Sequence, residues 1–324
     1  MNTNRRAIAA LAAAGLLWGT SVPLSKLALG WLAPGWLTAV RFGVAAVILL
    51  LATPRAGLRA ACRPLVLASG AFGYGGSVIV QNAGITRTSV THAALLVGAV
   101  PVLVAVIAAV WQRSLAPPVA WAGFAVSLAG VGLITAGRGG GASPGGDALV
   151  LVSLLLSATF TVGQVRLLRG QDPIAVTAVQ FLGAALAVPP FSAVAEGLPA
   201  APHGAGPVLA VVALAAGGTL LPFTLFAYGQ SRVSAELAGA FVNLEPLVGA
   251  IAGVALFGNP AGPVQAAGGT AIIAGIAMSS LPLLRPRRRP GHRAFLRRGE
   301  GAPRRRAILS RSEGASRRTA QSPC

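Results

Sequence analysis

Arg41 and Glu245 are the two charged residues that the sequence places deep within long apolar stretches. Arg41 falls near the middle of the stretch 33 to 53, and Glu245 near the middle of the stretch 235 to 257. In a stretch that crosses a membrane, an ionisable group is costly and usually faces a cavity. Two roles are open for the pair. It is either a structural ion pair that locks two parts of the protein together, or a substrate and proton site.

Further polar and aromatic residues fall at similar depth, given a rise of ~1.5 Å per residue in a helix. Together with Arg41 and Glu245 they are the candidate lining of a substrate cavity: Trp18, Thr20, Tyr74, Gln180 and Asn243. Four others lie nearer the ends of their stretches and are candidate gate residues, although such side chains also serve helix ends and lipid headgroups: Gln81, Asn82, His92 and Gln164.

Proline follows the predicted cavity residue Glu245, and the counterpart of this Glu245-Pro246 step in the first half is Val100-Pro101. Proline removes a backbone donor and frees the carbonyl four residues earlier, which a neighbour or a cavity must satisfy. We therefore predict a helix break at each proline. Only the Glu245-Pro246 step carries a carboxylate, which motivates the hypothesis that Glu245 exchanges protons during function.

Constellations typical of enzymes or metal sites are not readable in the sequence. The histidines other than His92 and both cysteines fall in predicted loops or the tail, so no metal-ligand spacing exists. No Gly-Lys-Ser/Thr loop that would cradle a phosphate is present. We expect no metal, no cofactor and no enzymatic activity.

The composition is that of a membrane protein with several crossings. Hydrophobic residues make up 54% of the chain and charged residues 10%, which a soluble domain of this size could not hide from water. At ~20 residues per crossing, the apolar stretches predict an all-α polytopic protein with ten transmembrane helices near 7–27, 33–53, 64–83, 90–111, 117–136, 148–168, 173–193, 208–228, 235–257 and 262–283.

The chain also contains an internal repeat. Residues 84–130 match residues 229–275 without a gap at 14 of 47 positions, including the pairs Pro101/Pro246 and Gly123/Gly268. Five crossings per unit, an odd number, would turn the second copy upside down, as in many secondary transporters. We therefore predict two inverted five-helix repeats, 1–136 and 147–284, joined by a Gly-rich connector, 137–146, and followed by an Arg-rich cytoplasmic tail, 285–324.

Basic residues in the short loops gather on one side of the predicted helices, which places both termini in the cytoplasm by the positive-inside rule. The tail carries 13 Arg residues. It is interpreted mainly as a solvated topogenic segment, with contact to anionic lipid headgroups as the alternative and nucleic-acid binding disfavoured. A fused repeat needs no partner to form its cavity, so we expect a monomer or a loose homodimer.

Several short segments resemble one known family. They are Leu16-Leu-Trp-Gly-Thr-Ser21, Val40-Arg-Phe42, Gly146-Asp147, Asn243-Leu-Glu-Pro-Leu247 and Gly258-Asn-Pro260, and together they resemble EamA-type members of the drug/metabolite transporter superfamily. The resemblance implies a ten-helix bundle with a central cavity that moves solutes or metabolites across the inner membrane, often outward. It also places Trp18, Arg41, Asn243 and Glu245 at recurrent family positions. The family usually has an acid where this chain has Ser114 and Asn259.

These patterns favour an inner-membrane secondary transporter, expected to export a small polar or amphipathic metabolite such as an amino acid by alternating access. The alternatives are a channel or a lipid-handling membrane protein. The duplicated prolines favour moving, broken helices over a static pore.

Overall fold

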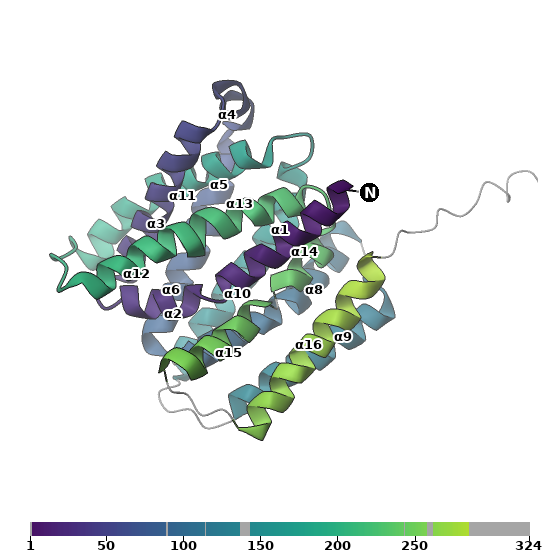
Figure 1. Cartoon of the computed structure of the whole chain (residues 1–324). Helices are drawn as coiled ribbons and strands as arrows, with labels where there is room; N and C mark the ends of the chain where they lie inside the picture. The colour runs from purple at the N-terminus through teal and green to yellow at the C-terminus, as the bar shows by residue number, and fades with distance from the viewer. Residues whose placement is uncertain are drawn as a thin grey trace, which may run out of the picture. The chain divides into compact units, whose positions relative to one another are not determined.

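The computed structural model of the chain describes residues 2–88, 90–113, 115–136, 143–242, 244–257 and 262–284. Asn243, Ser114, Asn259 and the Arg-rich tail lie outside these residues. Within them every regular element is a helix (Figure 1). The helices of the first half are α1 (Asn2–Trp18), α2 (Ser21–Ala28), α3 (Pro34–Ala52), α4 (Arg55–Ala61), α5 (Pro64–Gly70), η1 (Ala71–Gly76), α6 (Ser77–Arg87), α7 (Val90–Leu96), η2 (Val97–Ala99), α8 (Val100–Gln112) and α9 (Pro118–Ala136).

The described regular elements of the second half are also helices. Its helices are α10 (Pro144–Leu167), α11 (Pro173–Glu196), α12 (Ala205–Ala215), η3 (Ala216–Leu220), α13 (Leu221–Gln230), α14 (Ala235–Val242), α15 (Leu244–Phe257) and α16 (Pro263–Leu284). Helical segments lie on all ten apolar stretches. Five are long and apolar enough to cross a membrane by length and composition, so ten crossings stay a prediction: Arg5–Ala28, Pro34–Ala52, Pro144–Leu167, Pro173–Glu196 and Ala205–Gln230.

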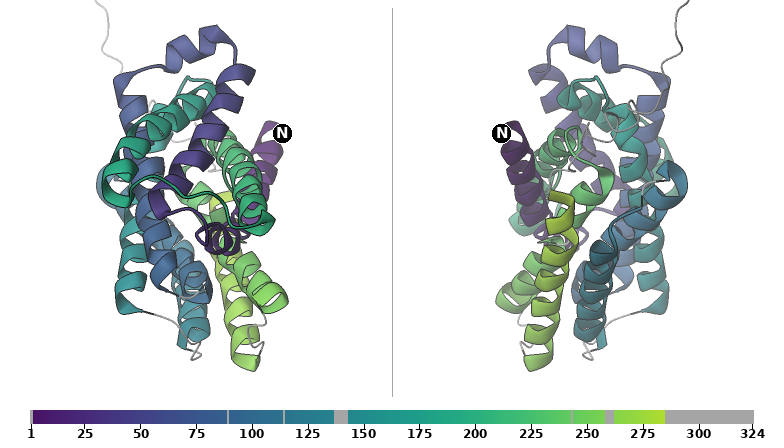
Figure 2. Two further views of the ribbon diagram at one scale, coloured as in Figure 1. Left: turned by 90° about the vertical axis from the view of Figure 1, so that its left-hand side faces the viewer. Right: turned by 90° about the vertical axis from the view of Figure 1, so that its right-hand side faces the viewer.

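The last helices of the two halves, α9 and α16, pack along each other, as Figures 1 and 2 show. Glycine makes this close approach possible. A Cβ at Gly123 would lie 2.7 Å from the carbonyl oxygen of Gly275, and a Cβ at Gly130 would lie 2.6 Å from that of Gly268. These four residues are the duplicated glycines of the sequence repeat, so the repeat conserves a helix crossing formed between its own copies.

Helices α3 and α11 also pack together. Both begin with proline, and in both a threonine one turn later donates its hydroxyl to the carbonyl of that proline at 2.8 Å, from Thr38 to Pro34 and from Thr177 to Pro173. The segments 38–42 and 177–181 read Thr-Ala-Val-Arg-Phe and Thr-Ala-Val-Gln-Phe. Arg41 and Gln180 therefore occupy equivalent positions on two helices of like construction.

Two π-helical segments interrupt the α-helices at equivalent places. η1 begins at Ala71 and η3 at Ala216, which is the same spacing that relates the sequence repeats. A π-helical turn widens the backbone and leaves carbonyl groups without their usual α-helical donors, and such turns are frequent at functional sites. η1 carries Tyr74, and η3 carries Thr219 at the equivalent position.

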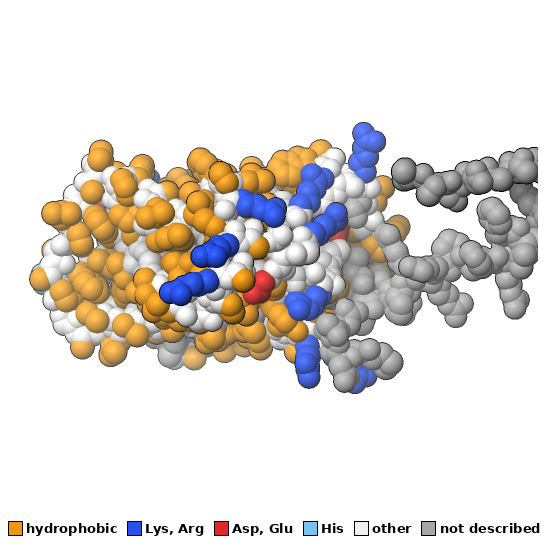
Figure 3. All heavy atoms as spheres, turned by 90° about the horizontal axis from the view of Figure 1, so that it is seen from above, with side chains coloured by type: hydrophobic (Ala, Val, Ile, Leu, Met, Phe, Trp, Pro, Cys, Tyr) orange, Lys and Arg blue, Asp and Glu red, His pale blue; other side chains and the backbone are white. Residues whose placement is uncertain are grey.

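Basic side chains gather on one face of the described helices, over the middle and right of the view in Figure 3, while its left part is largely hydrophobic. The exposed arginines of the loops and helix ends include Arg55, Arg59 and Arg63 around α4, and Arg166 and Arg169 at the end of α10. The basic side chains on this face agree with the positive-inside prediction, and the orientation itself stays a prediction.

Candidate functional site

A cavity of about 90 Å³ lies among helices of both halves. Four of the seven residues predicted to line a cavity do line it: Trp18, Arg41, Tyr74 and Glu245. Two predicted gate residues, Gln81 and Gln164, lie in its wall as well. The hydroxyl groups of Ser21, Ser77, Ser153, Ser157 and Thr161 belong to lining residues that the sequence analysis did not assign to the site.

Arg41 is 4% exposed and reaches from α3 to the π-helical segment η3. Its Nε donates to Thr219 Oγ1 at 2.7 Å, and its Nη2 donates to the carbonyl oxygen of Gly218 at 3.0 Å. The guanidinium carbon also lies 5.6 Å from the ring centroid of Phe42. One edge of the guanidinium is thus held by the second half of the chain, and Arg41 also lines the cavity.

Glu245 lies in the first turn of α15 and is 7% exposed. Its carboxylate hydrogen-bonds with the side chain of Ser21, at the start of α2. These segments pack closely. A Cβ at Gly19 would collide with the side chain of Val248 on α15. The absence of a side chain at Gly19 therefore helps to place the Ser21 hydroxyl beside the carboxylate.

Arg41 and Glu245 interact electrostatically across the cavity. The side chains of these two residues do not approach within 4.0 Å of each other, so they form no direct ion pair. Of the two roles left open by the sequence, the structural ion pair is therefore not formed in this conformation. Two opposite charges that face one cavity without touching can instead serve a dipolar or charged ligand.

Aromatic rings form a continuous wall of the cavity. Trp18 lies 4.9 Å from Phe223 and 5.0 Å from Phe226 between ring centroids. Tyr74 lies 4.7 Å from Phe223 and 4.6 Å from Phe160. All five of these residues line the cavity. The wall offers apolar and π-electron surface beside the two charges, which suits an amphipathic or cationic ligand.

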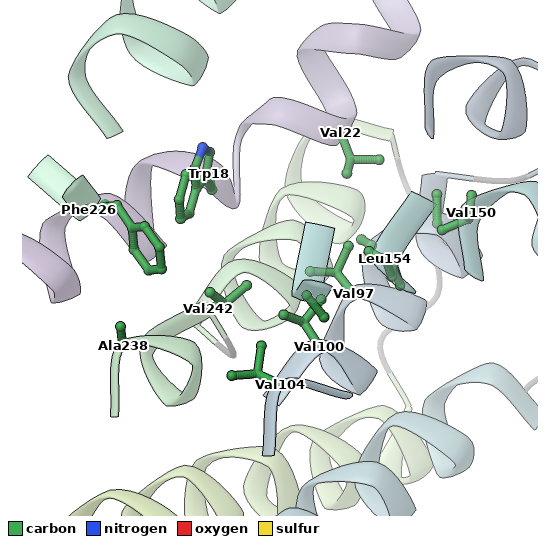
Figure 4. Close-up of a cluster of buried hydrophobic side chains, with 14 of the residues drawn as sticks. Trp18, Val22, Val97, Val100, Val104, Val150, Leu154, Phe226, Ala238 and Val242 are labelled. Carbon is green, nitrogen blue, oxygen red and sulfur yellow. The ribbon is translucent and has the colours of Figure 1, made fainter. Parts of the chain in front are cut away.

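A packed cluster of apolar side chains adjoins this wall (Figure 4). In Figure 4 Val97 and Val100, from the segment η2 to α8, lie near Val242 of α14, and Leu154 lies close by. These four side chains also line the cavity. The predicted break at Pro101 coincides with a change of helix type, because the 3-10 turn of η2 ends immediately before α8.

The two halves contribute equivalent positions to the cavity. From η1 onward, residues of the first half correspond to residues of the second half at the spacing of 145 found in the sequence repeat. A pseudo-twofold relation between the halves would produce this pattern. Four pairs of corresponding residues have both members in the lining: Val78 and Phe223, Gln81 and Phe226, Val97 and Val242, Val100 and Glu245.

Several predicted site residues lie elsewhere. Thr20 donates its hydroxyl to the carbonyl of Leu17 at 2.8 Å and is not in the lining, because the helix breaks between α1 and α2 at this point. Gln180 is also outside the lining, fully buried, and donates from Nε2 to Ser69 Oγ at 3.1 Å. The break and the packing of α11 on α5 turn these two side chains away from the cavity.

Asn82 is likewise not in the lining, because its Nδ2 donates to Thr38 Oγ1 at 3.0 Å and so joins α6 to α3. The side chain of His92 and the whole of Asn243 lie outside the described residues. Glu236, at the start of α14, is a further buried acid. It is 4% exposed, and its Oε1 has no hydrogen-bond partner among the described residues.

The chain is similar to known membrane transporters. The model of the EamA-like transporter family matches residues 5–136 and 144–281. A protein of Streptantibioticus cattleyicolor (strain ATCC 35852), named a probable terminal-alkyne amino-acid exporter, is 25% identical over 295 residues, which cover 89% of this chain and 99% of the relative. A solved crystal structure superposes with a TM-score of 0.71 at 22% identity, covering 86% of this chain and 97% of the other.

Proposed function

Because the chain belongs to the EamA-like transporter family, as its sequence motifs predicted, we propose that it is a secondary transporter of a small amphipathic metabolite such as an amino acid. One observation carries the proposal. The cavity is lined by equivalent positions of the two halves and holds one positive and one negative side chain beside an aromatic wall. An amino acid has the same three elements: two opposite charges and an apolar side chain.

We infer the ten-helix architecture of two inverted five-helix repeats from several supporting features. The family model matches two stretches of similar length, 5–136 and 144–281. The π-helical segments η1 and η3 and the proline-initiated helices α3 and α11 recur in the two halves, and α9 of the first half crosses α16 of the second at duplicated glycines. The domain boundaries of the sequence analysis, with the connector at 137–146, are part of this proposal.

Alternating access follows naturally from such an arrangement. Rocking of one repeat against the other opens the shared cavity first to one side and then to the other. Arg41 is a contact between the halves, since it joins α3 to η3. Its hydrogen bonds with a π-helical segment are of the kind that can rearrange as the halves move. We propose that Glu245 exchanges a proton in this cycle.

Export is the proposed direction, supported by the relative that is named an exporter and matches along nearly its whole length. The inner membrane is the proposed location, with both termini in the cytoplasm. A monomer or loose homodimer is the proposed assembly, and membrane lipid is the proposed partner of the Arg-rich tail.

Solute counterflow in proteoliposomes tests the proposal. Vesicles loaded with a mixture of unlabelled amino acids are diluted into a trace of the same labelled mixture, and transient accumulation of label is measured. A carrier accumulates label against its gradient because the internal solute drives exchange. Equilibration without overshoot would indicate a channel. The absence of any flux, in protein that remains folded and monodisperse, would contradict the proposal and direct attention to lipids.

Labelling of Cys62 tests the orientation. Cys62 is exposed in the segment between α4 and α5. In a Cys324→Ser background, a membrane-impermeant maleimide should label inverted membrane vesicles and leave intact spheroplasts unlabelled. Labelling of spheroplasts would place α4 outside and reverse the proposed orientation.

A further inference from the structure

We propose that the Glu245 end of the cavity is a subsite for a primary ammonium group, so that the transporter recognises the amine of its solute and does not require the solute's carboxylate. This inference rests on the proposed function and deepens it. It assigns unequal roles to the two charged side chains of the cavity, Arg41 and Glu245.

Arg41 has already committed one of its carboxylate-binding edges. Arginine binds carboxylates most strongly through two parallel N–H groups, and one such pair is formed by Nε and Nη2. In this structure Nε donates to Thr219 Oγ1 at 2.7 Å and Nη2 donates to the Gly218 carbonyl at 3.0 Å. A solute carboxylate would have to displace both bonds or accept only from the remaining N–H groups. Arg41 therefore acts mainly as a contact to η3 and as a balancing charge.

Glu245 is less occupied. Its carboxylate lies beside the single hydroxyl of Ser21, whereas a carboxylate has about four acceptor positions. It lines the cavity and is 7% exposed. A buried carboxylate with spare acceptors is a natural partner for an ammonium group, which has three donors and no acceptor.

Aromatic surface lies on the same side as this carboxylate. Trp18 precedes Ser21 by three residues at the junction of α1 and α2, and both line the cavity. The Trp18 ring in turn contacts Phe223 and Phe226. An ammonium group close to a tryptophan face gains cation–π attraction, and an adjoining alkyl chain gains apolar contact.

The equivalent place in the other half lacks these features. Val100 stands where Glu245 stands. Among the described residues of the lining, Glu245 is the one carboxylate. The subsite is present once, so an amine is held in one orientation.

A matched set of ligands tests the inference with the full-length purified protein. L-leucine, its decarboxylated amine isoamylamine and its deaminated acid isocaproate share one alkyl chain, and thermal stabilisation by each gives an apparent Kd. We expect the amine to bind within about tenfold of the amino acid and the acid to bind about ten- to a hundredfold more weakly, the cost of one lost charge-assisted hydrogen-bond set. Binding of isocaproate as tightly as leucine would overturn the inference.

Two variants make the assignment specific. Glu245→Gln should weaken leucine and isoamylamine by about ten- to a hundredfold and bring them level with isocaproate. Glu236→Gln is the matched control, because Glu236 is buried on α14 but does not line the cavity, and it should bind all three ligands as the wild type does. The comparison within the wild type stands even where a variant does not fold.

The outcomes separate this inference from the proposed function. If counterflow of amino acids occurs but the acid binds as well as the amine, the subsite is wrong and the transporter stands. If an amine series gives no stabilisation while another solute shows counterflow, the subsite is again wrong. If no solute shows counterflow, the proposed function fails as well, and with it the ground for the subsite.

Discussion

The segments 38–42 and 177–181 show how two nearly identical stretches of sequence come to different uses. They share four of five residues, begin with a threonine that bonds to the proline one turn earlier, and end in Phe42 and Phe181, whose ring centroids lie 5.3 Å apart. Only Arg41 and Gln180 differ. Arg41 lines the cavity and bonds to η3, whereas Gln180 is fully buried against Ser69.

Duplication therefore accounts for the similar helices around the site, and single substitutions account for its different side chains. The same is true of Val100 and Glu245, which are equivalent and both line the cavity. Each difference puts a charge in one half and a neutral side chain in the other. The cavity is therefore asymmetric in charge although its walls are related in sequence.

Gln180→Arg should have the largest effect on stability. Its environment is fully buried and offers one hydroxyl donor or acceptor, Ser69, instead of the carbonyl and hydroxyl that hold Arg41. An unpaired buried charge costs about 3–5 kcal/mol. Thermal unfolding in detergent should show a Tm well below that of the wild type, and a Tm equal to the wild type would contradict the difference between the two positions.

Glu245→Gln should have the next largest effect, on transport. Loss of the carboxylate removes charge-assisted hydrogen bonds worth about 1.5–3 kcal/mol, so the initial rate of counterflow at low solute concentration should fall by about ten- to a hundredfold. Residual transport should also lose the pH dependence of the wild type. A variant with unchanged pH dependence would end the hypothesis of proton exchange at Glu245.

Thr219→Val should have a smaller effect. The substitution keeps the shape of the side chain and removes the acceptor of Arg41 Nε, a bond to a charged donor worth about 1.5–3 kcal/mol. Tyr74→Phe changes the equivalent residue of η1 and loses only the 3.3 Å bond from Gln164, so it serves as the matched comparison. Equal losses of Tm in the two variants would contradict the special place of Arg41 at η3.

Ser69→Ala should have the smallest effect. It removes the acceptor of the Gln180 amide, an interaction between neutral groups worth about 0.5–1.5 kcal/mol. Transport by this variant should stay at the wild-type rate because Gln180 does not line the cavity. A large loss of transport with a small loss of Tm would show that the segment 177–181, which contains Gln180, takes part in function.

Much of the frame was readable in the sequence. Apolar stretches separate cleanly from loops, so the helical ranges were predicted closely, and depth within a stretch identified Arg41 and Glu245 as cavity residues. The crossing of α9 with α16 was present as duplicated glycines, although their partners were not. These features depend on local composition and spacing, which a single sequence displays directly.

The side chains that face the cavity were less predictable. Thr20 and Gln180 sit at the right depth, but the helix break at Gly19 and the packing of α11 on α5 rotate them away. Phe160, Phe223 and Phe226 were missed because an aromatic residue in an apolar stretch carries no mark of which neighbour it faces. The glycines around Tyr74 and Thr219 were the available signal for η1 and η3, and the match of 38–42 with 177–181 at four of five residues was the signal for Arg41 and Gln180.

The most direct test of the account compares Arg41→Gln with Gln180→Met in the counterflow assay. Arg41→Gln gives both halves the same residue, and Gln180→Met removes the polar group from the second half without changing its length greatly. We predict that Arg41→Gln loses counterflow by about tenfold or more, as expected for a lost charged contact, while Gln180→Met retains it and both proteins remain folded. Equal activity of the two variants would contradict the claim that the halves share a frame but divide the chemistry of transport unequally.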